Sequence, residues 1–127
     1  MADEIQIITK LYAAKGGAYL GSEQTSVTLD MAGTHMASGT QAIGTGSDEA
    51  LDIPADITGN HWLLVKNLEA EGGNYIELGT ATGGSFTGTA IFGRVPGGGT
   101  VLMYRTGTTY AKANTASVNI EWKACQV

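Results

Sequence analysis

The chain has little of what builds a cross-linked or metal-stabilised protein. Its 127 residues include one cysteine, two histidines and two prolines. The single cysteine, Cys125, allows no disulfide within the chain, and two histidines without a Cys-x-x-Cys pair do not make a structural zinc site. No apolar run approaches the ~20 residues that a membrane-spanning helix needs. The core must therefore form from ordinary apolar side chains, which a chain of this length can supply.

Positive charge is also scarce. Seven basic residues stand against 12 acidic ones, for a net charge of −5, and the basic residues occur singly along the sequence. Nucleic-acid binding needs a clustered positive surface, and an anionic membrane repels an acidic chain. We therefore expect neither a nucleic acid nor a membrane as partner. The acidic start, Met1–Glu4, lacks the basic and apolar regions of a secretory signal, so we expect a soluble protein made in a cytoplasm.

What the chain has in abundance is glycine and short alternating segments. Glycine occurs 19 times, about twice its average usage of about 7%, and without a collagen-like period. In residues 118–124, Val118, Ile120, Trp122 and Ala124 alternate with polar residues. Side chains on a strand alternate between its two faces, so this pattern predicts a strand with one buried face.

Similar segments recur about every ten residues and predict about eight strands, with no convincing helix. The predicted strands are residues 4–14, 25–32, 35–44, 62–68, 75–79, 86–95, 100–105 and 117–126. We expect an all-β fold, a single-domain antiparallel β-sandwich over residues 1–127, jelly-roll-like in type. Residues 1–22 are assigned as an N-terminal arm or edge strand that contacts neighbours.

Two hairpins and two connections complete this prediction. Residues 62–68 are expected to pair with 75–79, and residues 86–95 with 100–105 across the turn at Pro96–Gly99. Residues 47–56 are predicted to be an acidic loop or short strand. Residues 106–115 are predicted to be a polar connection. Val27, Leu29 and Met31 are expected to face inward.

The acidic and histidine residues were weighed as ligands for metals. His35 and His61 lie 26 positions apart, and we interpret them as strand or surface residues. The carboxylates in residues 47–56 (Asp48, Glu49, Asp52 and Asp56) could bind calcium, but their spacing does not match an EF-hand loop. A solvated acidic loop is the favoured interpretation, with a salt bridge to a basic neighbour as an alternative. We predict no metal site.

Catalytic and cofactor chemistry finds no better support. Glu77 and Glu121 could form a glycosidase pair only if they converged across a cleft, and nothing in their spacing shows this. The glycine runs at residues 83–84 and 97–99 lack the motif of a phosphate-binding loop and are predicted to be hairpin turns. Cys125 is predicted to be an unpaired, partly exposed thiol. We predict no catalytic residue and no cofactor, and hence a protein that is not an enzyme.

Aromatic residues offer one further alternative. Trp62, Trp122, Tyr75, Phe92 and Tyr104 could form a sugar-binding platform, although aromatics on strands more often belong to a core. A carbohydrate-binding module therefore remains open as a rival interpretation.

Two stretches resemble a known family. They are residues 60–79, containing Val-Lys-Asn-Leu and Asn-Tyr-Ile-Glu-Leu-Gly, and residues 110–122, containing Ala-Asn-Thr-Ala-Ser-Val. Together, over residues 60–122, they resemble small virion structural proteins of tailed bacteriophages. The resemblance implies a component of the virion, assembled in the host cytoplasm: a capsid decoration or cement protein bound to the major capsid protein or another virion protein. It implies a homo-oligomer, such as a trimer, with a tail, adaptor or fibre-associated binding module as the alternative.

The first strand suggests how such a protein would attach. Apolar groups occur on both of its faces, with Ile5, Ile7 and Leu11 on one side and Ile8 and Tyr12 on the other. A strand of this kind with an unpaired edge invites addition to another chain. We therefore expect Ile5–Tyr12 to reach a neighbouring subunit.

Overall fold

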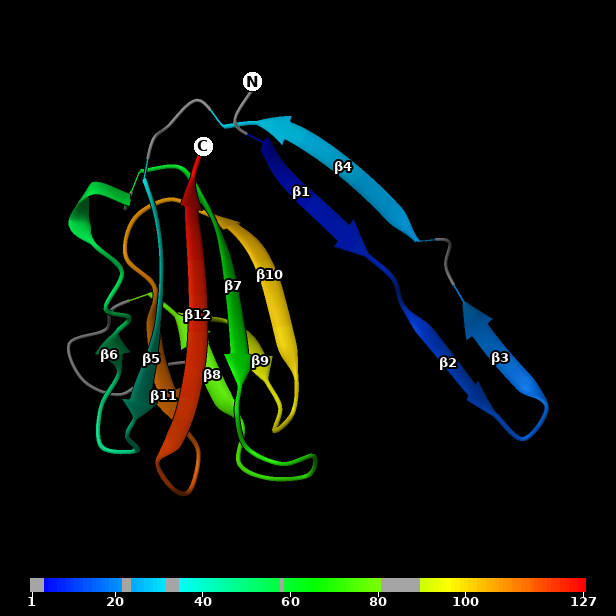
Figure 1. The fold of residues 1–127 in the computed structure, drawn as a ribbon. Helices are drawn as coiled ribbons and strands as arrows, with labels where there is room; N and C mark the ends of the chain where they lie inside the picture. Colours follow the sequence, from blue (N-terminus) through cyan, green and yellow to red (C-terminus); the bar gives the residue numbers. More distant parts are fainter. Residues whose placement is uncertain (1–3, 22–23, 32–34, 58, 81–89) are drawn as a thin grey trace. The chain divides into compact units, whose positions relative to one another are not determined.

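The N-terminal part of the chain folds back on itself as a long two-stranded ribbon, which we call the arm (residues 4–30). The computed structural model describes residues 4–21, 24–31, 35–57, 59–80 and 90–127. In the arm (Figure 1), β1 (Glu4–Thr9) pairs with β4 (Thr25–Asp30), and β2 (Tyr12–Lys15) pairs with β3 (Ala18–Gly21). The chain divides into two compact units, Met1–Gly33 and Thr34–Val127. The first unit contains the arm, and we call residues 35–127 of the second the body.

The tip of the arm is a two-residue turn at Gly16 and Gly17. These glycines have φ angles of +57° and +83°, and the residues on either side, Lys15 and Ala18, pair with each other. A type I′ turn needs positive φ at both central residues, which glycine adopts without the strain of a Cβ atom. The sequence predicted the end of a strand at these glycines but not the return strand β3, which is new.

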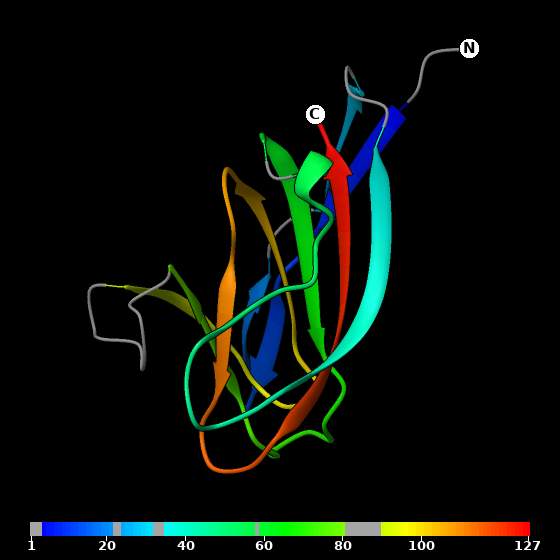
Figure 2. The same ribbon diagram turned by 90° about the vertical axis from the view of Figure 1, so that its left-hand side faces the viewer.

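The body contains two antiparallel sheets of four strands each. Sheet 1 has the order β10-β7-β12-β5, and its strands are β10 (Thr100–Arg105), β7 (His61–Asn67), β12 (Val118–Gln126) and β5 (Met36–Ile43). Sheet 2 has the order β6-β11-β8-β9, and its strands are β6 (Glu49–Ala50), β11 (Tyr110–Ala113), β8 (Ile76–Gly79) and β9 (Ile91–Val95). A single 3-10 turn, η1 (Ala55–Ile57), is the one helical element of the described residues. Figure 2 shows β5, β12 and β7 side by side in sheet 1, as their pairing requires.

One hydrophobic cluster takes side chains from both sheets. Sheet 1 contributes Leu63, Val65, Val118, Ile120, Trp122, Ala124 and Ile43, and sheet 2 contributes Ile76, Leu78, Val95, Ala111 and Ala113. The alternation in β12 is as predicted, because Val118, Ile120, Trp122 and Ala124 are all buried. The all-β, antiparallel class is therefore confirmed, with 12 short strands in the described residues where about eight were expected.

A buried amide links the two sheets at one end of the body. Asn67, at the end of β7, is fully buried, and its Nδ2 donates to the carbonyl oxygens of Asn74 at 2.8 Å and Val95 at 3.0 Å. Its Oδ1 accepts from the backbone N–H of Glu69 at 2.9 Å. A buried amide is tolerated only when its polar atoms are hydrogen-bonded. The Asn67 side chain makes three such hydrogen bonds. Asn67 thus fixes the loop that leaves sheet 1 for sheet 2.

Both predicted hairpins are wrong. Strands β7 and β8 belong to different sheets, and so do β9 and β10. Strand β7 lies between β10 and β12, which fits a central strand with large apolar groups on both faces. The loops at residues 68–75 and 96–99 therefore cross between sheets. Short loops with turn residues look alike in sequence whether they close a hairpin or change sheets, and this is the reason for the error.

Other expectations met mixed outcomes. Residues 106–115 were expected to connect strands, but Tyr110–Ala113 form β11 in the middle of sheet 2. Residues 47–56 contain the two-residue strand β6, as anticipated. Val27, expected to face inward, is 49% exposed, because the two strands of the arm have only each other as neighbours in their sheet. Residues 81–89, which include the start of the predicted strand 86–95, lie outside the described residues.

Candidate docking surfaces

The arm carries a disproportionate share of the exposed apolar surface. Nine large apolar side chains are exposed among the described residues, and five of them belong to the arm: Ile8, Leu11, Tyr12, Leu20 and Val27. Leu20 is 60% exposed and Tyr12 is 62% exposed. An isolated two-stranded ribbon is only marginally stable in water. Apolar side chains in this number on such a ribbon make it a candidate docking surface.

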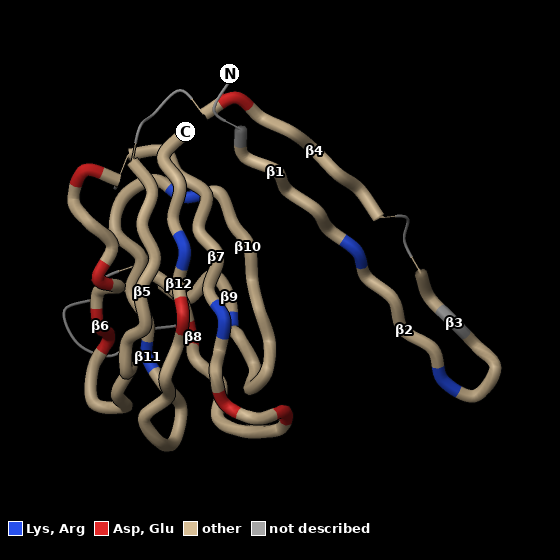
Figure 3. The backbone as a smooth tube through the Cα atoms, viewed as in Figure 1, with Lys and Arg blue, Asp and Glu red and all other residues tan. Residues whose placement is uncertain are grey.

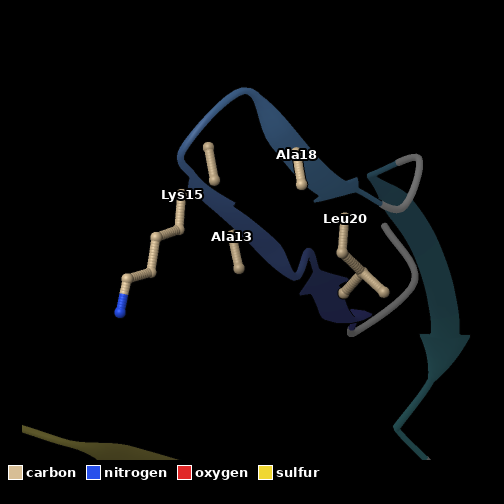
Figure 4. Close-up of a pocket in the computed structure, with 5 residues that line it drawn as sticks. Ala13, Lys15, Ala18 and Leu20 are labelled. Carbon is tan, nitrogen blue, oxygen red and sulfur yellow. The ribbon is translucent and has the colours of Figure 1, made fainter.

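The register places one of these side chains, Leu20, at a shallow hollow near the arm's tip. Leu20 lies opposite Ala13, and Ala18 lies opposite Lys15. Together with Ala14 these residues line a hollow of about 300 Å³. Figure 4 shows Ala13, Lys15, Ala18 and Leu20 as sticks on β2 and β3. The small alanines leave the floor open, so the hollow suits an apolar side chain from another surface.

The outer portion of the arm is also basic. Residues 5–21 contain Lys10 and Lys15 and no acidic residue. Figure 3 shows these lysines as the blue segments of the arm. The body, by contrast, has eight acidic and five basic residues. The segment 5–21 is therefore net positive, although the whole arm has three acidic residues, Glu4, Glu23 and Asp30, against its two lysines.

A second apolar surface lies on the outer face of sheet 1, and we call it the outer patch (Trp62, Leu64, Leu102 and Tyr104). Tyr104 pairs with Trp62 and Leu102 pairs with Leu64, so all four point to the same side. The intervening residues of β7, Leu63 and Val65, are buried on the other side. The rings of Trp62 and Tyr104 meet edge to face, with centroids 5.3 Å apart, and Tyr104 is 50% exposed.

The outer patch continues across the sheet. Cys125 lies opposite Trp62, and Met36, which is 69% exposed, lies opposite Cys125. Met36 and Cys125 also line a groove of about 300 Å³ between β5 and β12, whose other lining residues are Ala37, Ser38, Lys123 and Ala124. Apolar contact surface therefore runs across all four strands of sheet 1. Cys125 is half-buried in it, consistent with the predicted partly exposed thiol.

The sequence indicated large apolar groups on both faces of residues 62–68, but the strand aromatics were assigned to the core, so the residues that make up the outer patch were not predicted. Trp122 is in the core, but Trp62 and Tyr104 are on the outside of the sheet. The available signal was that residues 62–68 and 101–104 have large apolar groups at both odd and even positions. A strand with two apolar faces in a small domain points to a second covered surface.

The remaining aromatic candidates are each covered by an arginine. The Arg94 guanidinium lies 4.7 Å from the centre of the Tyr75 ring, and that of Arg105 lies 4.5 Å from the centre of the Phe92 ring. Arg105 also donates to the Thr109 hydroxyl at 3.0 Å. Partial burial lowers the pKa of the Arg105 guanidinium from its usual value. The five aromatic side chains therefore do not form one platform.

The two histidines have separate surroundings. His35 Nε2 lies 3.1 Å from Asp56 Oδ2, and its Nδ1 lies 3.0 Å from Gln126 Oε1, both near the surface. His61 is fully buried, and its Nδ1 lies 2.6 Å from the carbonyl oxygen of Gly59. The contact between His35 and Asp56 joins the start of β5 to η1. His35 therefore links distant chain segments, whereas the His61 contact is local to its own segment.

The carboxylates are dispersed among structural contacts. Glu49 Oε1 accepts from the backbone N–H of Gly44 at 2.7 Å, and the backbone N–H of Asp52 donates to Gln41. Within the described ranges, no group of three or more histidine, cysteine or acidic side chains could hold a metal ion. Asp56 contacts His35, and this contact is a salt bridge when the imidazole is protonated.

Glu77 and Glu121 lie on different sheets. Glu77 is on β8 and has Arg94 Nε 3.5 Å from its carboxylate. Glu121 is on β12 with Lys123 Nζ at 3.8 Å. Each sits between buried neighbours on its strand, so each carboxylate points away from the shared hydrophobic cluster. The sheet geometry does not bring them together.

The glycine run at Gly97–Gly99 forms a tight turn between sheets. Gly98 has a φ angle of +76°, and the Gly99 N–H donates to the Pro96 carbonyl oxygen at 2.8 Å. The run is a turn as predicted, although not one within a hairpin. The other run, at residues 83–84, lies outside the described residues.

No helix within the described part of the chain is long and apolar enough to span a bilayer. No protein-family model, no curated protein and no solved structure matches the chain.

Proposed function

We propose that this protein is a non-enzymatic structural component of a tailed-phage virion, a head decoration protein that binds and stabilises the capsid shell. Its partners are the major capsid protein or another virion protein and further copies of itself. Residues 60–122, which resemble such proteins, cover β7–β11 and most of β12. We further propose that the two sheets pack as a jelly-roll-like β-sandwich.

The observation that carries the proposal is the difference between a body with a buried core and an arm with exposed apolar side chains. The body has a buried cluster built from both sheets, and the arm has an exposed apolar side chain on each of its four strands. A cement protein must present a preformed surface at subunit junctions, because a rigid surface loses little conformational entropy on docking. The arm supplies apolar anchors of the kind that dominate interface energies.

The test is binding to heads that lack this protein. Purified full-length chain is added to undecorated heads, and bound copies are counted. We expect saturable binding at hundreds of copies and greater survival of the decorated heads on heating or osmotic shock. Binding of a dozen copies or fewer would overturn a decoration role in favour of an adaptor or fibre. Equal survival with full occupancy would overturn the cementing role.

Truncation separates the two parts of the proposal. A chain lacking residues 1–14 loses β1 and most of β2 but keeps every strand of the body. We expect it to keep a folded body by circular dichroism and to lose binding to heads. Undiminished binding of the truncated chain would exclude the arm as the attachment element.

One observation favours a second candidate, a carbohydrate- or receptor-binding module of a tail or fibre. Trp62 and Tyr104 are on the outer face of sheet 1 and not in the core. Aromatic rings at a surface can stack on sugars. A glycan-binding screen with the Tyr104→Ala variant as control decides between the two, because this candidate alone expects binding that the variant loses.

A further inference from the structure

We propose that the outer face of sheet 2 binds a short oligosaccharide that carries a carboxylate, such as one containing a uronic or sialic acid. We call this surface the glycan face (Tyr75, Glu77, Arg94, Tyr110 and Lys112). The proposal goes beyond the decoration role and does not depend on it. It also differs from the carbohydrate candidate above, whose aromatic pair lies on sheet 1.

Strand pairing brings the glycan face together from three strands of sheet 2. Lys112 on β11 lies opposite Glu77 on β8, and Glu77 lies opposite Arg94 on β9. Tyr110 and Tyr75 each lie two residues from a member of this row, and side chains two apart on a strand share a face. The neighbouring residues on β8 and β11 are buried in the hydrophobic cluster: Ile76, Leu78, Ala111 and Ala113. The charged row and the two rings therefore point outward together.

Arg94 is a cation whose position is already restrained. Its guanidinium lies 4.7 Å from the centre of the Tyr75 ring, and its Nε lies 3.5 Å from the Glu77 carboxylate, yet its side chain is 62% exposed. Because Glu77 contacts Nε, it does not occupy the pair of Nη groups, which suits a carboxylate in two parallel hydrogen bonds. A side chain held by a ring and a carboxylate loses less entropy when a ligand binds.

Tyr110 offers an aromatic ring to a sugar. It lies opposite Gly79 on β8 and Ala50 on β6, so neither directly opposite residue places a large side chain beside the ring. The residue is half-buried. The C–H groups on one face of a sugar ring carry partial positive charge, and the face of an aromatic ring is negative. A sugar stacked on Tyr110 would bring its carboxylate toward Lys112, two residues along the same strand.

The distribution of charge favours a short ligand over a long polyanion. The row across sheet 2 has two cations and one carboxylate, and Arg105 adds a third cation over a ring on β9. Asp48 and Glu49 lie at β6, the opposite edge of the sheet, and the whole chain has a net charge of −5. A nucleic acid needs a continuous positive surface, which this arrangement does not provide. One carboxylate on a sugar needs only the local cations Arg94 and Lys112.

The experiment uses the purified full-length chain and a panel of uronic-acid and sialic-acid oligosaccharides, each beside its methyl ester. The ester keeps the sugar and removes the negative charge, and titration calorimetry measures both affinities. The variants are Arg94→Gln, Lys112→Gln and Tyr110→Ala, and the matched controls on sheet 1 are Lys123→Gln and Tyr104→Ala. Circular dichroism and thermal melting verify that each variant is folded.

We expect at least one acidic oligosaccharide of the panel to bind, and its methyl ester to bind at least about tenfold more weakly. Each variant of the glycan face should lower the affinity about tenfold, the size expected for one charged hydrogen bond or one stacked ring. Both controls should bind as the unmodified chain does. Because Lys112 points away from the core, its variant keeps the test valid if Tyr110→Ala fails to fold.

Four results would overturn the proposal. They are no binding of any acidic oligosaccharide at millimolar concentration, equal binding of acid and ester, binding that all three variants of the glycan face retain, and loss of binding in Tyr104→Ala alone. Tighter binding of single-stranded DNA or polyglutamate than of any oligosaccharide, lost in the Arg94 and Lys112 variants, would assign the face to a polyanion instead. The decoration role is tested by head binding and does not change with any of these results.

Discussion

The arm and the body are both built from short antiparallel strands, but their side chains differ in burial. Side chains on β12 alternate between fully buried and exposed, because a second sheet covers one face. Every described residue of β2 is exposed, and so is nearly all of β4. Alternation along a strand therefore defines two faces but does not say whether anything covers them. In the body the chain itself supplies the cover, and in the arm we assign that role to a partner.

The comparison extends to glycine. In the arm, Gly16 and Gly17 are needed for their positive φ angles and have open space around them. In the body, Gly97 is needed for its size, since an added Cβ would collide with the Ala70 carbonyl oxygen and the Gly73 backbone. One residue type thus shapes a turn in the arm and permits close packing in the body.

The largest effect should come from the shared core. Ile120 is fully buried on β12, and we expect Ile120→Ala to lower the free energy of unfolding by about 2–5 kcal/mol, through lost burial and the cavity left behind. Chemical denaturation measures the change, with exposed Asn119→Ala as the control. A loss below about 1 kcal/mol would mean that the body lacks a close-packed core.

The buried amide between the sheets should rank next. Asn67→Ala removes the donor to the Asn74 and Val95 carbonyl oxygens and the acceptor for the Glu69 N–H. We expect a total loss of about 1–3 kcal/mol in the free energy of unfolding, the usual cost of leaving a buried polar group without its partner. The same denaturation assay applies, and Asn119→Ala again serves as the comparison. Wild-type stability in the Asn67 variant would show that these hydrogen bonds do not stabilise the connection between the two sheets.

A loss in the same range is expected at the turn between sheets. Gly97→Ala should destabilise the body by about 1–3 kcal/mol, the usual range for overpacking. Gly46→Ala is the matched control, because nothing lies within 4 Å of a Cβ built at Gly46. If both variants melt at the same temperature, the close contacts at Gly97 do not affect the stability of the body.

The smallest effect on the body should come from the tip of the arm. Gly17→Val opposes a φ angle of +83° at a local cost of about 1–2 kcal/mol. We expect faster amide exchange in β2 and β3 and an unchanged melting temperature of the body. A fall in the body's melting temperature would show that the two units unfold together.

The sequence was sufficient for the all-β class and for the buried face of β12, because a strict alternation is a local pattern. It was insufficient for strand pairing, because the turn residues at 69–74 and 96–99 have the same composition in a hairpin and in a crossing between sheets. Strand β11 was missed because Tyr110–Ala113 contains two alanines and a lysine, and its burial depends on neighbours distant in sequence.

Only part of the candidate surfaces could be predicted from the sequence. Apolar groups on both faces of Ile5–Tyr12 pointed to the arm, since a strand of that kind needs more cover than one partner supplies. The return strand β3 was missed because four residues with a glycine show too little alternation. The outer patch was missed because Trp62 and Tyr104 meet only through the pairing of β7 with β10, which no local pattern encodes.

Hydrogen–deuterium exchange of the full-length chain, dilute and free or bound to heads, tests the central claim most directly. The account predicts that body amides on β7 and β12 are protected in both states. Amides on β1–β4 should exchange quickly in the dilute chain and gain strong protection on the head. Arm amides as protected in the dilute chain as those of the body, with no gain on binding, would contradict it.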